Sequence, residues 1–102
     1  MAKLHTVNKS PYEKTSLAAC ISRSSAGSAI LLIEDGVYAA LAGGSAAALV
    51  KEALSDRKVY VLGPDLKARG LANQALIEGV ESVDFDGFVD LTAQYDQVKA
   101  WL

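Results

Sequence analysis

The chain has very little cysteine, histidine and proline: one Cys, one His and two Pro in 102 residues. One cysteine cannot form an intramolecular disulfide, so the sequence excludes a small secreted scaffold held by disulfides and favours a reducing compartment. The opening residues contain no apolar run of signal-peptide length, and no stretch reaches the roughly 18 to 20 apolar residues that a membrane span needs. We therefore expect a cytoplasmic protein that does not contact a membrane.

The chain also has little net charge. Its ten Lys and Arg nearly balance its twelve Asp and Glu, which leaves a net charge of −2. A slightly acidic chain is poorly suited to hold nucleic acid phosphates by itself, so we expect no direct nucleic acid binding. Apolar residues are abundant instead, at 51% with a mean hydropathy of +0.20. Length and composition predict a single domain over residues 1–102, and the large apolar share predicts an oligomer.

Four apolar segments have the composition of strands, and the second of them is unbroken, as in a strand covered on both faces of a parallel sheet. The predicted strands are Lys3–Asn8, Ala29–Ile33, Lys58–Leu62 and Val80–Phe85. Helix-forming residues follow them, over segments 10–27, 37–42, 46–54 and 87–94, with a short helical or irregular link after the third strand. This alternation predicts an α/β domain of three layers, with a mostly parallel sheet of four to five strands flanked by helices.

Polar residues and glycines at the segment boundaries predict where the helices begin and end. Ser10 with Pro11 and Glu13 has the order of a capped helix start, and Thr15 with Ser16 offers a second start for the same helix. The remaining predicted boundaries are N-caps at Asp35, Ser45 and Asp86, and a C-terminal glycine at Gly27.

Ligands of an open parallel sheet bind beyond the carboxyl ends of its strands, so the candidate turns are 8–10, 34–36 and 63–65. None has the G-x-G-x-x-G or P-loop pattern, and Gly43, Gly44 and Ser45 follow a helical segment rather than a strand, so we expect no nucleotide. Glu34 and Asp35 are adjacent acids without His or Cys beside them, which is typical of a capped turn. We expect neither a metal nor a cofactor.

Cys20 is the one side chain that is nucleophilic on its own account. On a helical wheel it falls between the apolar positions Leu17 and Ile21 and the polar positions Ser16 and Arg23. Arg23 and the nearby helix N-terminus favour a thiolate that accepts sulfur as a persulfide. Free cysteine is also among the most buried residue types, and the spacing alone favours this second interpretation, a small core residue.

His5 and the C-terminal residues are the other candidates. His5 lies in the first predicted strand without an identified Ser or Asp partner, so we expect a structural histidine. The tail from Tyr95 carries an apolar stripe of Tyr95, Val98, Trp101 and Leu102. This stripe is expected either to meet a partner or to fold back onto the core.

Four blocks of the sequence resemble the DsrH/TusB family of small sulfur-relay subunits in order and spacing. They are Leu4–Pro11, Leu31–Ala40, Val59–Leu62 continued by Asp65–Leu71, and Phe88–Thr92 with Trp101. The resemblance covers nearly the whole chain and implies a DsrE-like fold of the Rossmann or flavodoxin-like type. It also implies a heterohexamer holding two copies each of three related chains, in which the sister subunits are DsrE/TusD-like and DsrF/TusC-like.

In such relays a sulfane sulfur passes as a persulfide between cysteines and reaches a small carrier, DsrC or TusE. The resemblance places the best-supported acceptor cysteine on the DsrE/TusD-type sister, so this chain is a sulfurtransferase-type relay subunit or a purely structural one, and not an enzyme in isolation. Cys20 corresponds to the cysteine of DsrH-type members, whereas TusB-type proteins of enteric bacteria can lack it. Cys20 is therefore the candidate persulfide carrier.

The two branches of the family deliver sulfur differently. Dsr complexes serve sulfur oxidation through DsrC, and Tus complexes feed thiolation of the wobble uridine in certain tRNAs. Because the chain has Cys20, the resemblance favours the DsrH branch over the TusB branch.

Two other functions are disfavoured by the residues themselves. A receiver-type phosphoacceptor needs a carboxylate cluster where the first strand ends, and this chain has Thr6, Val7 and Asn8 there. A rhodanese-like enzyme acting alone places its cysteine in a loop of backbone donors, whereas Cys20 lies within a predicted helix.

Overall fold

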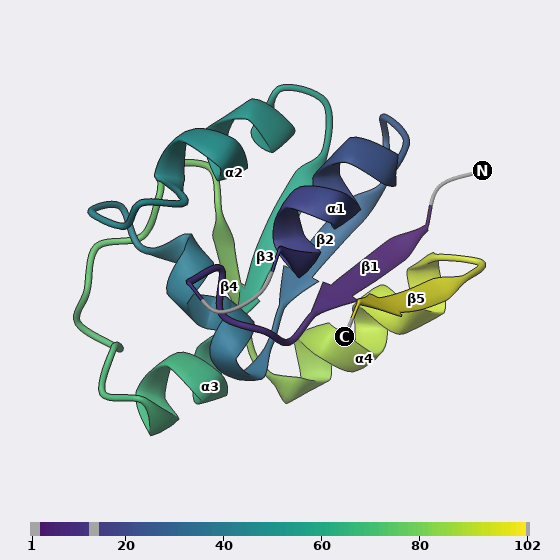
Figure 1. Ribbon diagram of the computed structural model, residues 1–102. Helices are drawn as coiled ribbons and strands as arrows, with labels where there is room; N and C mark the ends of the chain where they lie inside the picture. Colours follow the sequence, from purple (N-terminus) through teal and green to yellow (C-terminus); the bar gives the residue numbers. More distant parts are fainter. Residues whose placement is uncertain (1–2, 13–14, 102) are drawn as a thin grey trace.

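Five parallel strands form one sheet in the order β4-β3-β2-β1-β5 (Figure 1). The computed structural model describes residues 3–12 and 15–101. The central strand β2 lies between β1 and β3 and is buried along its length, as its unbroken apolar run predicts. The strands are β1 Leu4–Val7, β2 Ala29–Leu32, β3 Lys58–Leu62, β4 Glu81–Val83 and β5 Val98–Trp101.

Helices cover both faces of this sheet and complete the three predicted layers (Figure 1). They are α1 Ser16–Arg23, the 3-10 helix η1 Glu34–Ala40, α2 Ala47–Leu54, α3 Gly63–Ala68 and α4 Phe85–Gln94. Crossovers between parallel strands are right-handed, so the steps from β1 to β4 stay on one side of the sheet and the return to β5 takes the other side. In the picture α1 and α2 accordingly lie in front of the sheet, and α4 lies behind it. Within the described ranges, no helix has the length and apolar character needed to cross a membrane.

Successive residues of each strand point to opposite faces, which gives the domain two apolar clusters. Beneath α1 and α2, the strands contribute Val7, Ile30, Leu32, Val59 and Val61. The cluster beneath α4 is smaller and consists of Leu4, Ala29, Leu31, Tyr60 and Leu91. The helix α4 therefore covers this second face through Leu91 and the partly buried Phe88, and its opposite side meets solvent.

The prediction that the first helix begins at Ser10 is wrong. The hydroxyl of Ser10 instead accepts a hydrogen bond from the Tyr12 amide at 3.2 Å, which closes a turn, and α1 begins at Ser16. Glu13, the residue expected to complete the cap, lies outside the described residues. Thr15 occupies the N-cap position, so the second predicted start is the correct one, although its side chain makes no capping bond within the described part of the chain.

Three other boundaries also differ from the prediction. The helix α1 ends at Arg23, and Gly27 lies in the following turn, where its φ of +86° suits glycine. At α2 the N-cap position is Ala46 rather than Ser45. At α4 the capping side chain is Asp84, which accepts the Gly87 amide at 2.7 Å, while Asp86 lies in the first helical turn.

The tail forms a strand that the sequence did not predict. Val98–Trp101 pairs in register with Leu4–Val7, so β5 extends the sheet beyond β1. Trp101 is partly buried and packs on the cluster beneath α1, which means that the tail folds back onto the core. Leu102 lies outside the described residues.

Candidate functional site

The three candidate turns meet at the carboxyl edge of the sheet, as the parallel topology predicts. The Glu34 amide donates to Asp65 Oδ2 at 2.6 Å, which joins the turn after β2 to the start of α3. Arg69 Nε donates to Asp35 Oδ1 at 2.9 Å. Asp35 is the second residue of η1, and its side chain pairs with Arg69. The prediction that Asp35 caps a helix is therefore wrong.

The turn after β1 joins this group through a close backbone approach. Gly36 lies so near the Val7 carbonyl that a Cβ on residue 36 would overlap the carbonyl oxygen. A shallow pocket of about 340 Å³ opens beside these turns, lined by Ser10, Tyr12, Asp35 and Tyr38. Two acids of this edge, Asp35 and Asp65, therefore hold the turns together.

Cys20 lies on the buried side of α1, between the helix and the sheet. Its side chain is 0% exposed, and it belongs to the cluster beneath α1 and α2 together with Leu17 and Ile21. Burial raises the pKa of the Cys20 thiol from 9.0 to about 12, against a smaller lowering by Arg57 and Lys99. The neutral thiol is therefore the form present at physiological pH.

The predicted position of Cys20 at the border of the helix is wrong, because its side chain is fully buried with Leu17 and Ile21. The same cluster is also covered by Trp101 of β5, a residue that a helical wheel of α1 does not include. Arg23, the expected neighbour of the sulfur, is exposed and is not among the charges that act on the thiol. Arg57 and Lys99 act on it instead, and they come from sequence positions far from Cys20.

His5 contacts the C-terminal strand β5 on the face of the sheet that α1 and Cys20 cover. The Trp101 indole Nε1 donates to His5 Nδ1 at 3.0 Å, and the two rings lie with centroids 6.1 Å apart. Lys99 Nζ lies 4.4 Å from the centre of the Trp101 ring, within the range of a cation–π contact. Because His5 Nδ1 accepts this bond, the ring must be neutral there.

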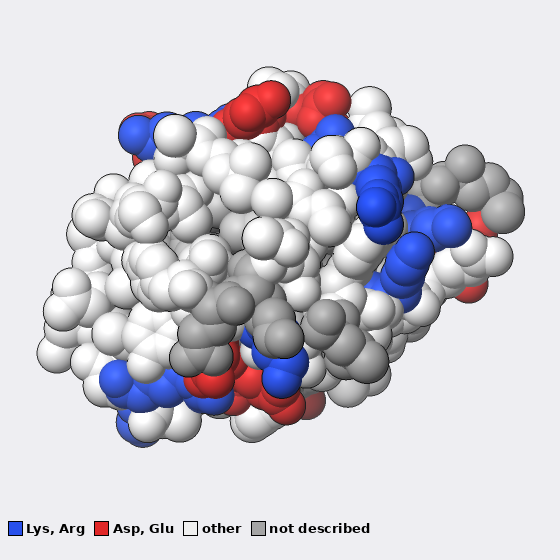
Figure 2. All heavy atoms as spheres, in the orientation of Figure 1, with Lys and Arg blue, Asp and Glu red and all other residues white. Residues whose placement is uncertain are grey.

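Positive charges surround His5 at the edge where β1 and β5 begin. Burial lowers the pKa of His5 from 6.5, and Lys3, Lys99 and Arg57 lower it further. In Figure 2, Lys and Arg side chains gather on this side of the molecule. The environment of His5 therefore favours the neutral ring that the Trp101 bond requires.

We expect the free energy of unfolding to fall as the pH drops below about 6.5, because the unfolded chain then takes up a proton that folded His5 resists. The loss continues down to the lowered folded pKa and amounts to at most about 1.4 kcal/mol per pH unit. Urea unfolding of the wild type and of His5→Gln between pH 7 and 5.5 measures it. Parallel pH profiles for the two proteins would refute this role of His5.

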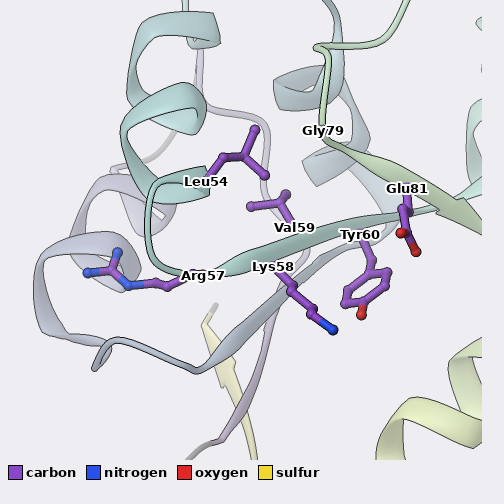
Figure 3. Close-up of a pocket in the computed structure, with 7 residues that line it drawn as sticks. All are labelled: Leu54, Arg57, Lys58, Val59, Tyr60, Gly79 and Glu81. Carbon is purple, nitrogen blue, oxygen red and sulfur yellow. The ribbon is translucent and has the colours of Figure 1, made fainter.

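A pocket of about 250 Å³ opens at the amino end of β3 (Figure 3). In the close-up, Tyr60 and Glu81 point to the same side of the sheet, while the Arg57 side chain extends away from the other labelled residues. Burial raises the pKa of the Tyr60 hydroxyl, and Tyr95 and Glu81 add to this. The lining has no thiol or imidazole: it consists of Leu54, Arg57, Lys58, Val59, Tyr60, Gly79 and Glu81.

Comparison with known proteins gives a consistent result along the chain. Residues 9–98 match the family described as "DsrH like protein". The chain is 38% identical to Protein TusB of Pectobacterium parmentieri over 99 residues, covering 96% of this chain and 99% of the relative. It is also 38% identical to Protein TusB of Shigella flexneri over 98 residues, with the same coverage of 96% and 99%.

Two solved structures share the fold. The crystal structure of the YchN protein from E. coli matches with a TM-score of 0.75 at 22% identity, covering 98% of this chain and 99% of that one. A protein of unknown function from Methanobacterium thermoautotrophicum matches with a TM-score of 0.76 at 15% identity, covering 97% and 99%. At these identities the likeness concerns the fold, and it confirms the predicted α/β class with its parallel sheet.

Proposed function

Because the chain belongs to the DsrH/TusB family of sulfur-relay subunits, we propose that it is one subunit of a cytoplasmic heterohexamer with two copies each of three related chains. Its sister subunits are of the DsrE/TusD and DsrF/TusC types. The complex passes sulfur to a small carrier of the DsrC/TusE type. In each transfer the acceptor thiolate attacks the outer sulfur of a persulfide, a new S–S bond forms, the old one breaks, and the donor cysteine leaves as a thiolate.

The role of this chain within the relay is to support the assembly, while a sister chain carries the sulfur. The observation that carries this proposal is the position of Cys20. A thiol that is 0% exposed with a pKa of about 12 has neither the access nor the thiolate form that attack on a persulfide needs. Cys20 in the folded chain instead fills the core between α1 and the sheet.

Cys20 as a persulfide carrier is the second candidate. It is favoured by Arg57 and Lys99, which both lower the pKa of the thiol. These cations would stabilise an anionic sulfur if contact with a sister subunit opened the core around Cys20. The two candidates differ in whether Cys20 gains sulfur in the assembled complex.

The sulfur acceptor distinguishes the two branches of the family. Cys20 favours a DsrH-type subunit, which serves sulfur oxidation through DsrC. The relatives at 38% identity bear the name Protein TusB, which favours a TusB-type subunit in tRNA thiolation. Loss of 2-thiouridine from tRNA on deletion of the chain supports the TusB branch, and intact thiolation supports the DsrH branch.

Coexpression with the DsrE- and DsrF-like sisters tests the proposed assembly. Native mass spectrometry of the purified product is expected to give a hexamer with two copies of each chain. If this chain purifies apart from both sisters at micromolar concentration, the proposed function is wrong.

A further inference from the structure

The outer side of α4 presents a ridge of apolar side chains to solvent. Phe85 and Val89 are 59% and 64% exposed, the highest values among the large apolar residues that the structure describes. They are four residues apart, so they lie on one side of the helix, and Ala93 continues the same line. Leu91, on the opposite side, is buried against the sheet. The ridge therefore has no role in the core of this chain.

A third exposed apolar residue faces the same side of the sheet. Val98 in β5 is 49% exposed and stands in register with Leu4 of β1. Register partners in parallel strands point to the same face, and Leu4 belongs to the cluster beneath α4. Phe85, Val89 and Val98 thus all lie on the α4 side of the molecule, which makes that side its largest gathering of exposed large apolar residues among those described.

The segment that contains α4 is also strongly acidic. Segment 70–98, which includes β4 and α4, has six acids and no Lys or Arg, for a net charge of −6. All ten Lys and Arg and the other six acids lie outside the segment, for a net charge of +4. Asp86 and Asp90 are exposed on α4 itself, one helical turn apart and next to the ridge.

We propose that the α4 ridge, defined as Phe85, Val89 and Ala93 with the flanking Asp86 and Asp90, docks a sister subunit of the relay complex through a surface that is apolar at its centre and rimmed by Lys and Arg. This proposal rests on the proposed function. The acids beside the ridge select a basic partner, because opposite charges around an apolar centre set specificity and orientation. The apolar ridge supplies the contact area.

A second copy of this chain is a poor occupant of the same surface. A two-fold dimer brings each patch against its own copy, so Asp86 and Asp90 would meet the same acids of the other protomer.

The area that a stable interface needs shows how far the docking surface extends. Such an interface buries roughly 800 Å² on each partner. That is about a seventh of the 5576 Å² surface of this chain, so the contact extends from α4 toward Val98.

The test compares surface variants in coexpression with both sister chains. Phe85→Lys/Val89→Lys is expected to weaken hexamer assembly at least roughly 30-fold, because it replaces the apolar centre with charges that repel the basic rim. Asp86→Lys/Asp90→Lys is expected to weaken assembly and to reduce its dependence on salt. Ala48→Lys, on the exposed side of α2, is the matched control and is expected to assemble like the wild type.

Thermal unfolding of each free variant confirms that it folds, since every substituted side chain is exposed. Assembly of Phe85→Lys/Val89→Lys at wild-type strength overturns the docking surface and leaves the proposed function intact. If the wild type itself fails to assemble with the sisters, the proposed function falls and the docking surface with it. A wild-type homodimer that the lysine variant disrupts would assign the ridge to a second copy and overturn the proposal.

Discussion

Iodoacetamide at pH 8 will modify Cys20 of the folded, isolated chain at least roughly 1000-fold more slowly than Cys20 of the denatured chain. The thiolate is the reacting form, and a shift of the pKa from 9.0 to about 12 lowers its fraction about 1000-fold at this pH. The absence of exposed surface on the side chain slows the reaction further.

Intact mass measured against time, with and without urea, gives both rates. The chain has no second cysteine, so every carboxamidomethyl group on a thiol reports Cys20. A folded rate within tenfold of the denatured rate would contradict the burial of the thiol. It would also remove the main support for a structural cysteine.

Gly36→Ala will lower the free energy of unfolding by at least about 2 kcal/mol, because its Cβ overlaps the carbonyl oxygen of Val7 and meets the carbonyl carbon at 3.0 Å. That carbonyl accepts the Ile33 amide at 3.0 Å, so it cannot move away without loosening the end of β2. The substitution therefore separates two of the turns that meet at the carboxyl edge.

Gly43→Ala is the matched control, since a Cβ at that position has nothing within 4 Å. Its effect is expected to stay within about 0.5 kcal/mol of the wild type. Urea unfolding with a shared slope compares the two variants. Equal stability of both would show that the approach between Gly36 and Val7 is looser than described.

The central strands could be predicted because their composition alone determines their place. The unbroken apolar run that begins at Ala29 is rich in β-branched and aliphatic residues and needs cover on both faces, which a strand inside a parallel sheet has. Lys58–Leu62 is bounded by a polar residue and by Gly63, and it forms a strand with the predicted limits. β5 gave no such signal, because an edge strand of four mostly exposed residues needs little apolar composition.

In the candidate site, too, short-range sequence patterns predict the arrangement of the turns but not the contacts between residues far apart in the sequence. The meeting of the three turns follows from the parallel topology, which short-range patterns reveal. The partners of the acids do not, since Asp35 pairs with Arg69 across 34 residues and Asp65 bonds to Glu34 across 31. A helical wheel predicts a border position for Cys20 because it describes one helix and includes neither the sheet beneath it nor Trp101 of β5, which packs on the same cluster.

Intact masses of every subunit, recorded after the coexpressed complex is loaded with a sulfane-sulfur donor, test the central claim most directly. The account predicts that a sister chain gains the mass of one sulfur while this chain stays unmodified, and that a complex with Cys20→Ser behaves in the same way. A gain of one sulfur on this chain that is absent from Cys20→Ser would contradict the account and would show that Cys20 is a persulfide carrier of the relay.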